Sequence, residues 1–251
     1  MMSEFEKIYT WEFDAVSIFL RYFLLAGAAY LVFYVWKRKQ LAGIKIQKKI
    51  PPPSRIRSEI IYSVLTLLIF CGESWMIFYL KGKGMTKIYL DINQFGYLYF
   101  SLSIFIMVLI HDAYFYWTHR LMHIPQVFRF VHRRHHLSDN PTPWTAFSFH
   151  PIEAIIAAGI IPIIVFVIPS QPIAIFIFLT FMTFVNVMGH LGYETFPVKF
   201  RKNKIGQWQN TSTNHNIHHR HSGYNYGLYF TFWDKAMGTY KSETNESTMQ
   251  V

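Results

Sequence analysis

Histidines are the residues in this 251-residue chain whose spacing points most directly to chemistry. All twelve follow residue 110, and eight of them form three clusters: His119 and His123; His132, His135 and His136; and His215, His218 and His219. Side chains three or four residues apart meet on one face of a helix. Imidazoles gathered on one helical face form half of a metal-binding cup, so the clusters predict a metal site.

A metal explains these clusters better than packing or charge does. A lone histidine is usually a structural residue, but three spaced clusters are not explained in that way. Arg133, Arg134 and Arg220 stand among the histidines, so protonated imidazoles there would repel their neighbours. Eight imidazoles are more ligands than one tetrahedral zinc ion binds, so two metal ions are the smallest number that explains them. Imidazole suits iron, zinc, copper and nickel alike, so this argument leaves the metal open.

Long apolar runs predict that the histidines are carried by a membrane protein. The composition is 52% hydrophobic and 15% charged, and the apolar residues fall in runs at about 16–36, 60–80, from 95 onward, 152–168 and 173–188. About 20 apolar residues span a bilayer as a helix. We therefore expect an all-α, multi-span bundle of four to five apolar segments with a histidine-rich helical cap. The single Cys71 rules out a disulfide framework and a thiolate zinc site.

Basic residues predict the orientation of this bundle. Eight of them lie between the first two runs, and such loops face the cytoplasm: Lys37, Arg38, Lys39, Lys45, Lys48, Lys49, Arg55 and Arg57. The last two runs, split by Pro169 and Pro172, predict a hairpin that returns to its starting side. All histidine clusters then meet on the cytoplasmic face. The net charge of +10 comes from basic residues beside the apolar runs, which are expected to set the membrane topology and to contact anionic lipid. No nucleic-acid partner is expected.

The predicted domains follow this division. Residues 1–95 form an N-terminal membrane region, 96–240 a histidine-box domain, and 241–251 a disordered tail. Two charged residues interrupt the apolar runs: Glu73 is expected to face a protein interior or the membrane edge, and Arg21 to reach the interface. Asp112 is a candidate for orienting a ligand imidazole, because it shares a helical stripe with His119. His111 points away from that stripe and is predicted not to be a ligand.

The motifs resemble those of a known superfamily. HRLMH, HRRHH and HNIHH are similar to the three histidine boxes of the membrane fatty acid hydroxylase and sterol desaturase superfamily. The flanks NPTPWTAFSFHPIE and NYGLYFTFWDKAMGTY look most like the sterol C5-desaturase branch, and GHLGYE, which carries His190, is similar to a further histidine motif of the family. The resemblance covers residues from about 112 to 240.

The resemblance implies a non-haem di-iron site that uses O2 to hydroxylate or desaturate a lipid of sterol or fatty-acyl type. Zinc could occupy the same site in isolated protein. Carried over residue by residue, the metal ligands are His119, His123, His132, His135, His136, His190, His215, His218 and His219. His150 and His221 match family positions as second-shell candidates. Residues 225–227 with Trp233 and Asp234 match the tail motif, which is expected to close the cap.

The implied oxidase needs electrons from outside the chain. No GxGxxG loop or haem domain is evident, so a cytochrome b5-type, ferredoxin-type or similar reductase system is implied. The alternatives are a zinc-dependent membrane hydrolase and a non-catalytic metal-binding or transport protein. A transporter would place polar ligands at mid-depth, whereas these histidines gather at one end. HExxH is absent, which removes the zinc-protease arrangement.

Overall fold

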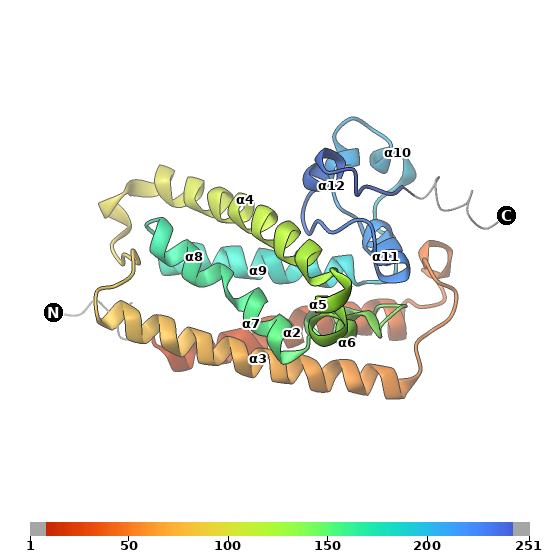
Figure 1. The fold of residues 1–251 in the computed structure, drawn as a ribbon, viewed down its shortest axis with the longest axis horizontal. Coiled ribbons are helices and arrows are strands. Elements are labelled where there is room, and N and C mark those ends of the chain that lie inside the picture. The colour runs from red at the N-terminus through yellow and green to blue at the C-terminus, as the bar shows by residue number, and fades with distance from the viewer. Residues whose placement is uncertain (1–8, 243–251) are drawn as a thin grey trace.

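Residues 9–242 are described by a computed structural model, and within that range the chain folds as a helical bundle without a named strand. Figure 1 shows the long helices running along the longest axis, with the C-terminal segments gathered at one end. Among residues 9–242, four helices are long and apolar enough to cross a membrane: α2 (Trp11–Tyr30, extended by a π-helical turn to Trp36), α3 (Pro53–Gly82), α4 (Gly96–Met122) and α9 (Pro172–Gly189). This architecture confirms the predicted fold class.

The predicted hairpin is present, with one arm broken in two. α7 (Pro151–Ala158) and α8 (Ile160–Val167) meet at Gly159, and α9 returns from Pro172. The turn between α8 and α9 reaches the end of the bundle opposite the histidines, because Ser170 pairs with Ile88 in the loop between α3 and α4. The hairpin therefore runs from near the histidine end of the bundle to the opposite end (Figure 1).

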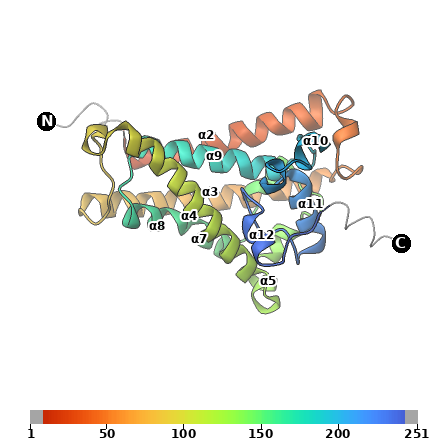
Figure 2. The same ribbon diagram turned by 90° about the horizontal axis from the view of Figure 1, so that it is seen from above.

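Short elements build the histidine end. They are α5 (Pro125–Val131), α6 (Arg133–His136), α10 (Val198–Arg201), α11 (Ser212–His221) and α12 (Phe232–Ala236). The basic loop between α2 and α3 lies at this same end (Figures 1 and 2). It contacts α11, the helix that carries the third histidine cluster, since Gln47 Nε2 donates to Asn216 Oδ1 at 3.1 Å.

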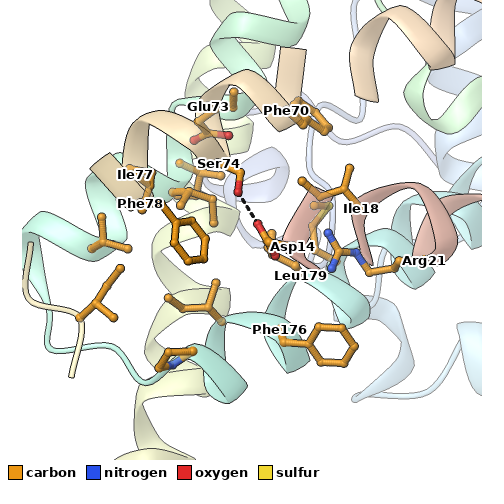
Figure 3. Close-up of a pocket in the computed structure, with 18 of the residues that line it drawn as sticks. Asp14, Ile18, Arg21, Phe70, Glu73, Ser74, Ile77, Phe78, Phe176 and Leu179 are labelled. Atoms are coloured by element: carbon orange, nitrogen blue, oxygen red, sulfur yellow. Dashed lines mark hydrogen bonds between the residues drawn. The ribbon is translucent and has the colours of Figure 1, made fainter. Parts of the chain in front are cut away.

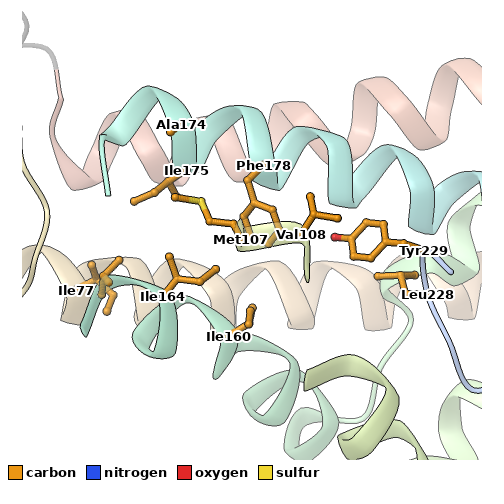
Figure 4. Packing of buried hydrophobic residues seen from close by; sticks show 11 residues of the cluster. Ile77, Met107, Val108, Ile160, Ile164, Ala174, Ile175, Phe178, Leu228 and Tyr229 are labelled. Carbon is orange, nitrogen blue, oxygen red and sulfur yellow. The ribbon is translucent and has the colours of Figure 1, made fainter. Parts of the chain in front are cut away.

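Two kinds of apolar surface account for the hydrophobic composition. Inside, α4, α8 and α9 interlock through Met107, Ile164 and Phe178, each fully buried (Figure 4). Outside, large apolar side chains stay exposed along the long helices, for example Leu24 at 66% and Leu98 at 84%. Exposed apolar area on this scale is unfavourable in water and is expected of helices that face lipid.

The two N-terminal helices hold the loop that follows the second histidine cluster. Glu59 of α3 is fully buried and accepts from Ser138 Oγ and Thr142 Oγ1, both at 2.7 Å. Tyr22 of α2 donates to the carbonyl of Trp144 at 2.8 Å. Because the second cluster ends only two residues before Ser138, these bonds fix where its imidazoles stand.

The C-terminal motif closes the cap, as expected. Asp234 of α12 accepts from the backbone N–H groups of Tyr226 and Gly227 at 2.9 and 2.8 Å. Asn225 exchanges hydrogen bonds with the backbone of Lys241, the first residue of the predicted disordered tail. The rest of that predicted tail, from residue 243, lies outside the described residues.

Replacing Glu59 tests how far this loop depends on the N-terminal half. Glu59→Ala leaves two buried hydroxyl groups without an acceptor, and each such charge-assisted bond contributes about 1.5–3 kcal/mol. We expect a clearly lower midpoint of thermal unfolding in detergent. Glu12→Ala, an exposed position on α2, is the control and should unfold near the wild-type temperature. Equal midpoints for the two variants would contradict this role of Glu59.

Candidate metal centre

The nine predicted ligand histidines converge at one end of the bundle in two groups. Within each group the candidate ligand nitrogens all lie within 4.8 Å of one another. The first group is His119, His123, His132, His136 and His218, and the second is His135, His190, His215 and His219. The structure thus brings together residues that are up to about a hundred positions apart, from α4, the α5–α6 corner, the end of α9, and α11.

Each HxxHH cluster serves both groups, which differs from the expectation that a cluster faces a single metal. In the second cluster His132 and His136 join the first group and His135 joins the second. In the third cluster the pattern is reversed, because His215 and His219 join the second group and His218 joins the first. The cause is helical geometry. Residues four apart differ by about 40° around the axis, whereas the remaining histidine points about 60–100° away from that pair.

The second cluster also departs from one regular helix. α5 ends at Val131 and α6 begins at Arg133, so His132 stands at the corner between them. Its backbone carbonyl still accepts from the N–H groups of His135 and His136, at 3.1 and 3.3 Å. The corner therefore keeps the spacing of a helical turn while changing the direction of the chain.

The nitrogens face one another at the separations expected around a metal. His119 Nε2 lies 3.0 Å from His132 Nε2, and His136 Nε2 lies 3.0 Å from His218 Nε2. In the second group His190 Nε2 lies 3.1 Å from His135 Nε2 and 2.8 Å from His215 Nε2. Two nitrogens bound to one metal at about 2.1 Å are about 3.0 Å apart at a right angle and about 3.4 Å apart at a tetrahedral one. The residues present therefore suit a metal in each group.

Hydrogen bonds to the other ring nitrogen hold several of these imidazoles in place. His119 Nδ1 lies 2.8 Å from the carbonyl of Tyr226, His190 Nδ1 lies 2.8 Å from that of Asn186, and His218 Nδ1 lies 2.7 Å from that of Tyr224. A carbonyl can only accept, so Nδ1 carries the proton and Nε2 presents its lone pair to the group. Metal-bound histidines are typically oriented in this way.

Glu153 is a functional candidate that the sequence reasoning missed. Its Oε1 lies 2.8 Å from His132 Nδ1, and both side chains are almost fully buried. A carboxylate behind a ligand imidazole fixes the ring and makes it a stronger base. The available signal was an acidic residue in the first turn of an apolar helix, directly after the FHP motif.

The three predicted second-shell residues have other positions. Asp112 Oδ1 accepts from the backbone N–H groups of Tyr229 and Phe230 at 3.3 and 3.2 Å, so it ties α4 to the C-terminal motif instead of orienting an imidazole. His150 Nδ1 accepts from the N–H of Ile152 and caps α7. His221 is exposed at the end of α11. His111 lies outside both groups, as predicted, and pairs with Tyr229 Oη at 2.8 Å.

Burial keeps the clustered imidazoles neutral. It lowers the pKa of His190 to about 4, and burial together with the nearby His119 lowers the pKa of His136 to about 3. The pKa values of His135 and His219 lie well below the ordinary value, first through burial and then through neighbouring imidazoles. Among the described residues, the buried His123 Nε2 has no hydrogen-bond partner. Neutral rings with free lone pairs are the form that binds metal ions.

An apolar cavity of about 50 Å³ opens beside both groups. His119 and His132 of the first group line it, and so do His135, His190 and His215 of the second. The remaining wall is mainly apolar and includes Phe115, Phe149 and Ile156. An apolar group held here would lie against both histidine groups at once.

Comparison with known proteins identifies the family of this chain. The chain is 28% identical to lathosterol oxidase of Rattus norvegicus over 231 residues, which are 90% of this chain and 72% of the relative. It is also 28% identical to a Delta(7)-sterol 5(6)-desaturase of Gibberella zeae over 191 residues, which are 74% of this chain and 54% of that protein. No solved structure gives a significant match. Residues 104–239, more than half of the sequence, match the fatty acid hydroxylase family model, and the chain therefore belongs to this family.

Proposed function

We propose that this chain is a membrane-bound di-iron oxidoreductase that uses O2 and external electrons to hydroxylate or desaturate a C–H bond of a lipid. The observation that carries the proposal is the pair of histidine groups that open together on one apolar cavity. Family membership supports the lipid oxidation, and the four apolar helices support a substrate taken from the bilayer.

The two histidine groups would hold one iron each. Iron bound there would supply the redox chemistry that removes hydrogen from an unactivated C–H bond. The chain itself orients the imidazoles, through Glu153 and through the carbonyls of Tyr226, Asn186 and Tyr224. The apolar wall of the cavity excludes water and favours a hydrocarbon segment over a polar one.

A sterol or sterol-like lipid is the substrate class that the relatives favour. They bear the names lathosterol oxidase and Delta(7)-sterol 5(6)-desaturase. The flanking motifs of the second and third histidine clusters support the same branch. A fatty-acyl lipid remains the other member of the proposed substrate class.

The histidine end is proposed to face the cytoplasm, because the basic loop between α2 and α3 lies beside it. An acidic electron-donor protein of the cytochrome b5, ferredoxin or similar type would meet exposed lysines there, at Lys199, Lys202 and Lys204. Arg134, which stands among the histidines of the second cluster, does not belong to this exposed basic surface. Its guanidinium stacks 3.9 Å from the Tyr62 ring and donates to Ser58.

Oxygen and electron demand separate this proposal from a zinc hydrolase. Purified protein in nanodiscs, supplied with lipid extract, reductant and an electron donor, should form a new lipid product in air. Under anaerobic conditions, or without reductant, mass spectrometry should find none of it. Product that forms equally well without O2 would favour the hydrolase, because attack by a metal-bound water needs neither reagent.

The division of the third cluster predicts unequal effects of two adjacent substitutions. His219→Ala leaves three imidazoles in a group of four, whereas His218→Ala leaves four in a group of five. We expect His219→Ala to reduce bound metal toward one ion per chain and His218→Ala to retain close to two with weaker binding. Mass spectrometry of metals on the purified variants measures this.

The exposed His221 of the same helix supplies the matched control. His221→Ala should keep the wild-type metal content, since its side chain belongs to neither group. Metal content that falls equally in all three variants would show that α11 simply unfolds. Full content in both His218→Ala and His219→Ala would contradict the ligand assignment.

Replacing Glu153 tests its action through His132. Glu153→Gln keeps the shape and removes the carboxylate that accepts from His132 Nδ1. Loss of such a partner typically weakens metal binding or activity by about 10–100-fold. Competition with a chelator should show this loss of affinity in the first group, with the second group little changed. A variant with wild-type affinity in both groups would leave Glu153 as a packing residue.

A further inference from the structure

A second, larger cavity lies between the membrane helices, farther from the histidines. Its volume is about 250 Å³, and it is enclosed mainly by α2, α3, α8 and α9. Figure 3 shows its lining, with Ile18, Phe70, Ile77 and Leu179 among the apolar side chains. Two of its lining residues, Phe13 at 51% exposed and Ile173 at 44%, also face outward, so the cavity borders the lipid-facing surface.

This larger cavity and the cavity beside the metal centre share a wall. Phe70, Phe147, Ala157, Ile160 and Met182 line both of them. Two helices, α7 and α9, connect this shared wall to the metal site over a short distance. Ala157 stands one helical turn from Glu153, which contacts His132, and Met182 stands one turn from Asn186, which contacts His190. A molecule in the larger cavity is therefore next to the metal centre.

The larger cavity also has polar lining residues, although it lies between membrane helices. Asp14 and Arg21 enter from one face of α2, and Glu73 enters from α3 (Figure 3). Asp14 Oδ2 accepts from Ser74 Oγ at 2.6 Å. Arg21 Nη1 and Glu73 Oε1 are buried without a hydrogen-bond partner among the described residues. Arg21 thus faces a cavity, where the sequence suggested that it would reach the membrane interface.

Unpaired polar atoms at this depth are costly unless a ligand meets them. A buried donor or acceptor without a partner costs about 1–3 kcal/mol, and more when it is charged. Ionisable side chains inside a membrane protein are accordingly rare and usually functional. Here a guanidinium offers a donor and carboxylates offer acceptors around one apolar space. A hydroxyl group both donates and accepts, so it is the simplest lipid group that suits this set.

The size of the smaller cavity supports a substrate that occupies both. At about 50 Å³ the smaller cavity has about one fifth of the volume of the larger cavity, so it holds only a small part of a lipid. The rest of a lipid must lie elsewhere, and the larger cavity is adjacent. We propose that the larger cavity binds the body of a lipid alcohol, with its hydroxyl group held by Arg21 and Asp14 and with Glu73 as a further acceptor. This inference rests on the proposed lipid oxidation.

Binding of two probes that differ by one hydroxyl group tests this site. The full chain in nanodiscs is titrated with radiolabelled cholesterol and with cholest-5-ene, which lacks the hydroxyl. We expect cholesterol to bind at least about tenfold more tightly, because a site built to bond a hydroxyl rejects the analogue without it. Arg21→Met should reduce this ratio to about twofold or less and leave the binding of cholest-5-ene unchanged.

Arg57→Met, which removes an exposed arginine at the histidine end, should keep the wild-type ratio. Equal binding of the two probes by the wild-type protein would overturn the proposal, whether or not the variants fold. A tenfold preference retained by Arg21→Met, Asp14→Asn and Glu73→Gln would overturn it as well. Metal content and O2-dependent product are measured on the same samples. Failure of the proposed oxidation would appear there and would leave the probe ratio unaffected.

Discussion

The convergence of imidazole lone pairs is the constraint on which the cap depends. Opposed Nε2 atoms about 3 Å apart, in rings that burial keeps neutral, are unfavourable unless a proton or a cation lies between them. The carbonyls behind His119, His190 and His218 already hold the Nδ1 proton, which leaves a cation as the natural partner of Nε2. A metal bound in each group would turn this repulsion into an interaction that joins four separate segments.

Helical geometry explains how so few segments build two histidine groups. An HxxHH cluster holds one i, i+4 pair and one histidine turned away from it, so each cluster gives a pair to one group and a single imidazole to the other. The second cluster gives its pair to the first group, and the third cluster gives its pair to the second group. The two groups are therefore interlocked through shared segments, and a shift of α11 would disturb both of them.

Span length and i, i+4 spacing are local properties, so the sequence predicted the helices and eight of the nine histidines that the structure brings together. The ninth, His190, came from the family resemblance. The sequence did not predict how the set divides, since that depends on the angle at which α11 meets the α5–α6 corner. For the same reason Glu153 was missed, and the role of orienting a ligand imidazole was assigned to Asp112. A stripe on one helix shows which side chains share a face, but which segment packs on that face is set by the loops. Here the C-terminal motif covers Asp112, and α7 brings Glu153 to His132.

The N-terminal half supports the histidine cap and lines the larger cavity. Residues before 104 lie outside the family match, and they supply no histidine. They do supply Glu59 and Tyr22, which hold the loop after the second cluster, and the polar side chains of the larger cavity. The histidines need close, rigid spacing at one end of the bundle, whereas a lipid needs length along it. Long helices meet both requirements, because one end of them contacts the cap and holds the histidines in place. Farther along, the same helices enclose the larger cavity, where the lipid is proposed to lie.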